Sequence, residues 1–128
     1  VFSDGAVRLG ILTDTGSITA HIRQRLDRCD ALLLECNHDT AMLADGPYPP
    51  SLKQRVGGRL GHLSNRQAAE LLGMLDTSVL THLVAAHLSD KNNRPELARA
   101  ALAAALGCDS DWIGVADQAA GLDWRQVG

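Results

Sequence analysis

The chain has 128 residues, 45% of them hydrophobic, which is enough for one domain with a buried core. Its formal net charge of -3 provides no overall attraction to nucleic acid or membranes, so a phosphate-binding role would require a local basic patch. No apolar run approaches the ~20 residues of a membrane helix, and the three cysteines have no CxxC spacing. We therefore expect a cytoplasmic protein with reduced thiols and no membrane partner.

Strands and helices alternate along the chain, as apolar periodicity and turn residues indicate. A turn signal at Asp4-Gly5 predicts an initial hairpin, which we interpret as starting inside a longer polypeptide. No internal repeat or domain boundary is evident, so residues 1–128 are expected to form one α/β unit, ending in a polar tail with Trp124. The predicted elements are strands over 6–13, 31–34, 80–86 and 112–116, and helices over 17–29, 39–45, 50–56, 64–75 and 94–106.

Capping residues mark the helix ends. Ser64 with Gln67 three residues later forms a capping-box pattern, and Ser17 or Thr19 is expected to cap the first helix. Pro95 suits the first turn of the Ala-rich helix, which Gly107 should terminate.

Four polar residues lie at or just after apolar segments, where open α/β sheets build their sites. Asp14 follows the first strand and can bind a metal ion, although a turn-forming aspartate explains it equally well. His87 follows the third strand, and a core histidine with one hydrogen bond is the favoured reading of it in isolation. Glu35 can orient another site residue or cap a turn, and His62 can hold a phosphate oxygen beside a helix start or simply occupy a loop.

The remaining polar residues carry weaker signals. A lone Cys36 is better explained as a small buried hydrophobe than as a ligand, and His21 and His82 are read as structural. The one basic cluster comprises Lys53, Arg55, Arg59 and the nearby Arg66, and such loops are usually just solvated.

Together these residues resemble the C-terminal half of metallo-β-lactamase-fold hydrolases, in the phosphodiesterase and nuclease branch near tRNase Z. The resemblance covers roughly residues 6–120 and is closest to a bacterial subgroup with proposed exonuclease activity toward DNA. It is carried by the following segments: Thr13-Asp14-Thr15-Gly16, Glu35-Cys36-Asn37-His38-Asp39, Met42-Leu43, Gly46-Pro47-Tyr48-Pro49, Leu52-Lys53, Gly61-His62-Leu63-Ser64-Asn65, Gln67-Ala68-Ala69 and His87-Leu88-Ser89.

The resemblance implies a mixed β-sheet covered by helices on its outer face, which is half of an αββα sandwich. It also implies two divalent metal ions, zinc or manganese, for which Asp14 would be the bridging ligand and His87 a terminal one. His62 and Glu35 would form the non-ligand catalytic pair. Asn65, Ser89 and Lys53 are the expected substrate-binding residues.

The family's His-x-His-x-Asp-His loop, which supplies most metal ligands, is not in this chain. The resemblance therefore implies an inactive fragment of a metal-dependent phosphodiesterase acting on nucleic acid. An exposed inner sheet face should pair with the missing N-terminal half or self-associate. Two alternatives stay open: a non-enzymatic α/β interaction domain, and a related hydrolase of esters or thioesters.

Overall fold

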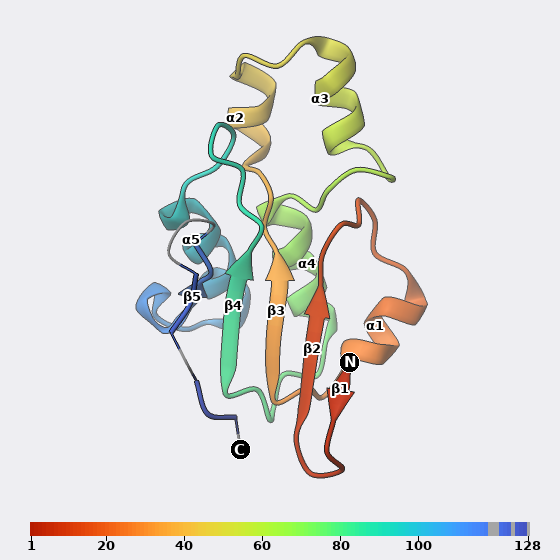
Figure 1. Cartoon of the computed structure of the whole chain (residues 1–128), viewed down its shortest axis with the longest axis vertical. Coiled ribbons are helices and arrows are strands. Elements are labelled where there is room, and N and C mark those ends of the chain that lie inside the picture. The colour runs from red at the N-terminus through yellow and green to blue at the C-terminus, as the bar shows by residue number, and fades with distance from the viewer. Residues whose placement is uncertain (118–120, 124, 128) are drawn as a thin grey trace.

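A computed structural model describes residues 1–117, 121–123 and 125–127, so Trp124 lies outside the described residues. The described residues form a mixed α/β fold around one five-stranded sheet with the strand order β1-β2-β3-β4-β5 (Figure 1). The first pair is antiparallel and the others are parallel. The strands are β1 (Phe2–Ser3), β2 (Arg8–Leu12), β3 (Ala31–Glu35), β4 (His82–Ala86) and β5 (Gly114–Val115).

The helices follow the predicted order, with differences at their ends. Thr19 caps the first helix by accepting a hydrogen bond from the backbone N–H of Ile22, and this helix ends earlier than predicted. Trp112 lies in a 3₁₀ turn, Ser110–Trp112, instead of beginning the last strand. The helices are α1 (Ala20–Leu26), α2 (Thr40–Asp45), α3 (Pro50–Gly57), α4 (Asn65–Met74) and α5 (Pro95–Leu106).

One face of the sheet forms the hydrophobic core. In the pairing of β3 with β4, Leu32 lies beside Leu83 and Leu34 lies beside Ala85, so these side chains share one face of the pleated sheet. They pack in one buried cluster with residues of α1, α4 and α5, and α4 and α5 lie behind the sheet in Figure 1. This packing holds the carboxyl ends of β2, β3 and β4 side by side.

The opposite face is apolar and has no covering helix among the described residues (Figure 1). Ile11 is 44% exposed there, and its register partner Leu33 is half-buried. Residues near the end of the described chain reach the lower part of this face, where His82 Nε2 lies 2.8 Å from the carbonyl oxygen of Gln126. Ile11 is therefore an apolar side chain exposed on the sheet face opposite the core.

Within the described part of the chain, we find no helix with the length and apolar character needed to cross a bilayer.

The three cysteines differ in burial, which leads to a test of the core. Burial raises the pKa of the Cys36 thiol to about 12 and also raises that of Cys29, whereas Cys108 is exposed. Because the thiolate is the reactive form, we expect iodoacetamide at pH 8 to alkylate only Cys108 in the native protein and all three thiols in denaturant. Mass spectrometry of the time course measures this, and Cys108→Ser should abolish the fast phase. Alkylation of Cys36 at the rate of Cys108 would contradict the buried location of Cys36.

Candidate metal centre

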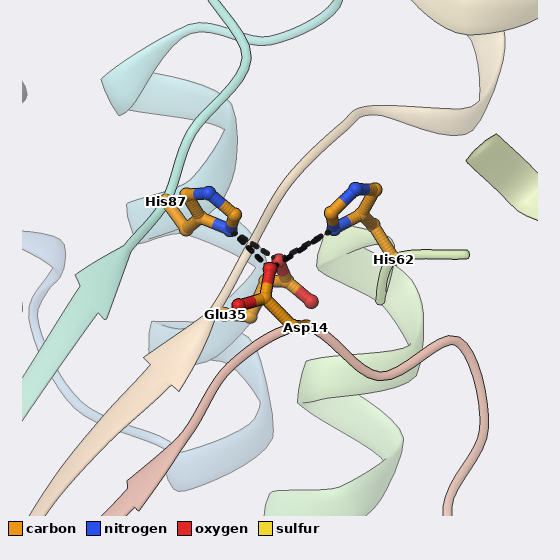
Figure 2. Close-up of side chains that lie close together, drawn as sticks. All are labelled: Asp14, Glu35, His62 and His87. Carbon is orange, nitrogen blue, oxygen red and sulfur yellow. Dashed lines mark hydrogen bonds and ion pairs between the residues drawn. The ribbon is translucent and has the colours of Figure 1, made fainter. Parts of the chain in front are cut away.

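Four side chains far apart in the sequence converge at the carboxyl end of the sheet. Asp14 follows β2, Glu35 ends β3, His87 follows β4, and His62 lies in the loop before α4 (Figure 2). Each residue offers one ligand atom such that all four atoms lie within 4.8 Å of one another. The convergence follows from the fold, because the carboxyl ends of neighbouring parallel strands meet at one edge of the sheet.

Two of these residues have an unusual backbone conformation. Asp14 has a φ of 58° and His87 a φ of 60°, both in the left-handed region. Aspartate and histidine are among the non-glycine residues that enter this region most readily. Each turns the chain within two residues of its strand's end, and Figure 2 shows both side chains directed toward Glu35.

Glu35 is the centre of the arrangement and is fully buried. Its Oε1 lies 2.9 Å from Nδ1 of His62 and 2.5 Å from Nδ1 of His87. Its Oε2 accepts a hydrogen bond from the backbone N–H of Leu63 at 3.2 Å. A carboxylate that accepts from Nδ1–H orients the ring and leaves the Nε2 lone pair available to a metal or a proton.

Asp14 completes the donor set from the solvent side. Its Oδ1 lies 3.6 Å from His87 Nδ1 and 3.9 Å from His62 Nδ1, and its side chain is 72% exposed. In Figure 2 the second ring nitrogens of both histidines point away from Glu35. Imidazole and carboxylate groups are ligands suited to zinc and manganese. The four residues therefore offer the donor types of a divalent-metal site, with Asp14 Oδ1 nearest to the two Nδ1 atoms.

The loop that carries His62 is held by its own backbone hydrogen bonds and lies in contact with the loop that carries Asp14. The backbone N–H of His62 donates to the carbonyl oxygen of Val56 at 2.9 Å, and the N–H of Gly61 donates to the carbonyl oxygen of Gly58 at 3.0 Å. A Cβ on Gly16 would lie 2.6 Å from the nitrogen of Gly61 and closer still to the oxygen of Gly58. Glycine at position 16 therefore lets the two backbones touch, which sets where His62 lies relative to Asp14.

The predicted substrate-binding residues lie outside this cluster and make other contacts. Asn65 and Asn93 are buried and exchange two amide hydrogen bonds, each of 2.8 Å. Ser89 Oγ accepts from the backbone N–H of Asn92 at 3.2 Å. Lys53 Nζ donates to the carbonyl oxygen of Ala44 at 2.5 Å, which links α3 to α2. A substrate contact by Asn65, Ser89 or Lys53 stays a prediction.

Sequence reasoning missed the part played by Asn93. Its side-chain Nδ2 also donates to the carbonyl oxygen of Cys36 at 2.8 Å, which joins the loop after β3 to the start of α4. The available signal was the Asn92-Asn93 pair directly before Arg94-Pro95, since asparagine often stabilises irregular backbone before a helix.

His38, three residues after Glu35, belongs to a different environment. It is 2% exposed, and its Nδ1 lies 3.2 Å from Oδ1 of Asn37. Burial lowers its pKa, and the charge of His62 lowers that pKa further. His38 lines a cavity of about 840 Å³ together with Lys53 and Arg66, and none of the four clustered residues lines this cavity.

Comparison with known proteins finds curated relatives under two names. The chain is 35% identical over 105 residues to a protein of Bacillus anthracis named exodeoxyribonuclease YycJ, an alignment that covers 82% of the chain and 40% of that relative. It is 34% identical over 115 residues to proteins named exodeoxyribonuclease WalJ in Streptococcus pneumoniae strains D39 and R6, covering 90% of the chain and 40% of each relative. No protein-family model matches, and no solved structure matches. The chain thus spans about 40% of the length of the curated relatives it matches.

Proposed function

We propose that this chain is part of a binuclear metal-dependent hydrolase that cleaves phosphodiester bonds of nucleic acid, removing nucleotides from an end. One observation carries the proposal: Asp14, His62 and His87 surround a fully buried Glu35 that hydrogen-bonds both imidazoles. The names of the curated relatives supply the substrate class, deoxyribonucleic acid, and the exonucleolytic mode.

The proposed fold is half of a metallo-β-lactamase αββα sandwich. The mixed sheet with helices on one face and an exposed Ile11 on the other supports this, because a second sheet would cover the apolar face. The proposed partner of that face is an N-terminal half carrying the His-x-His-x-Asp-His loop, or a second copy of the chain. Without such a partner we expect the chain to be inactive.

Asp14 and His87 would hold the metal ions, zinc or manganese. When bound, such ions lower the pKa of a coordinated water and stabilise negative charge on phosphate oxygens. Glu35 holds the ring of His87 through Nδ1, so that Nε2 is the free ligand atom. It holds His62 in the same way, so that His62 Nε2 would donate a hydrogen bond or a proton to a phosphate or leaving-group oxygen when the ring carries both protons.

The test uses the full-length gene product and an end-labelled oligodeoxynucleotide. We expect stepwise release of nucleotides that a chelator stops and zinc or manganese restores. Asp14→Ala and His87→Ala should lower both bound metal and activity, because each removes a ligand. His62→Ala should lower activity more than metal content, since His62 is not proposed as a ligand.

Matched exposed residues serve as controls. His21 and Asp111 are exposed, so His21→Ala and Asp111→Ala should leave metal content and activity unchanged. Wild-type metal content and activity in both Asp14→Ala and His87→Ala would refute the proposal. Cleavage of an ester or thioester, with no cleavage of DNA, would favour the related hydrolase instead.

A further inference from the structure

The positive charge of this acidic chain is concentrated in one segment. Residues 46–69, here called the basic segment, contain four Lys or Arg and no Asp or Glu. The rest of the chain contains eight basic and fifteen acidic side chains. A polyanion would therefore be attracted to the basic segment and repelled by the remainder.

The basic segment includes α3, the turn Gly58–Gly61, His62 and the first half of α4, and α3 lies beyond the carboxyl ends of the strands in Figure 1. Arg55 on α3 and Arg59 in the turn are exposed, and Leu60 is 100% exposed. Arg59 and Leu60 occupy the two central positions of the turn that the Gly61–Gly58 hydrogen bond closes.

The turn is rigidly held beside the metal centre. A Cβ on Gly61 would lie 2.7 Å from the carbonyl carbon of Val56, and Gly16 presses on the turn from the Asp14 loop. His62 follows the turn directly in the chain. Arg59 also lines a cavity of about 500 Å³ together with Arg23 and one carboxylate, Glu70. The positive charge therefore lies next to the loops that carry Asp14 and His62.

We propose that the Gly58–Gly61 turn and α3 bind a single nucleic-acid strand, with Arg55 and Arg59 on its phosphates and Leu60 against a base. The choice of ligand rests on the proposed function. Two exposed guanidinium groups suit phosphate oxygens, and an apolar side chain at a turn corner can pack on a base. A rigid turn loses little entropy on binding, because the loop is ordered before the strand arrives.

The test is fluorescence anisotropy of a labelled single-stranded oligonucleotide with the full-length gene product, with chelator present so that no cleavage occurs. We expect Arg55→Ala and Arg59→Ala each to lower affinity roughly two- to fivefold. Each should also reduce the slope of log affinity against log salt by about 0.7, because one phosphate contact is lost. Leu60→Ala should weaken binding and leave the slope unchanged, since an apolar contact releases no counterion.

Arg25→Ala is the matched control, because Arg25 is also exposed but lies in the last turn of α1, outside the basic segment. Unchanged affinity and slope in Arg55→Ala and Arg59→Ala would overturn the proposal, as would the absence of salt-dependent binding by the wild-type protein. Competition by an acidic peptide of equal charge as strong as that by unlabelled oligonucleotide would overturn the nucleic-acid assignment. Strand binding without nuclease activity of the full-length protein would refute the proposed function alone.

Discussion

Glu35→Gln is expected to lower the affinity of the centre for a divalent metal about 10- to 100-fold while leaving the fold intact. Glutamine has nearly the same shape but no charge, so its single carbonyl oxygen is a weaker acceptor for the two imidazoles, and its amide nitrogen cannot accept from the N–H of Leu63 as Oε2 does. The Oε1 atom of Glu35 is the shared acceptor for Nδ1 of His62 and of His87. With that acceptor weakened, the rings lose their fixed orientation and the Nε2 atoms lose basicity.

The measurement is a competition titration of zinc or manganese against a chromophoric chelator, alongside circular dichroism to monitor the fold. Glu70→Gln is the control, because Glu70 is an exposed carboxylate that pairs with Arg66 at 3.1 Å. Its affinity should equal that of the wild type. If Glu35→Gln binds metal as tightly as the wild type, Glu35 does not orient the ligands.

Gly16→Ala is expected to destabilise the protein by about 1–3 kcal/mol and to weaken metal binding. The added Cβ would meet backbone atoms, at 2.6 Å from the nitrogen of Gly61 and 2.8 Å from the carbonyl carbon of Arg59. Backbone cannot rotate away as a flexible side chain can, so the loop of Asp14 must separate from the loop of His62. That displacement alters the centre as well as the packing.

Urea denaturation measures the free energy of unfolding, and the same titration measures the metal. The control is Gly73→Ala, because a Cβ on Gly73 in α4 would meet nothing within 4 Å. Alanine there should stabilise the protein by about 0.5–1 kcal/mol, since glycine is a poor helix former. If Gly16→Ala is as stable as the wild type, the two loops are not in the close backbone contact that the structure shows.

The sequence predicted those features that depend on residues lying close together in the chain. Both hydrogen bonds of the capping box between Ser64 and Gln67 are present. Pro95 begins α5 and Gly107 ends it, as expected. These contacts span three or four residues, so their partners are visible in the chain itself. The predicted alternation of strands and helices is confirmed for the same reason, because it depends on local periodicity.

The sequence also identified Asp14, Glu35, His62 and His87 as the residues of interest, through their positions at the ends of apolar segments and through a family resemblance. Their separate roles could not be read from the residues alone. The shared acceptor joins Glu35 to residues 27 and 52 positions further along the chain. Such contacts require the parallel register of β3 and β4, which periodicity does not encode.

The sequence by itself determined the element order, the helix caps, the concentration of basic residues and the identity of the four polar side chains. Only the tertiary structure decided that Asp14 and His87 adopt left-handed backbone conformations, that Gly16 touches the turn before His62, and that Asn65 pairs with Asn93. The physical reason is the range of the interactions. Caps and periodicity act within one or two turns of chain, whereas the centre arises where the packed sheet brings strand ends together.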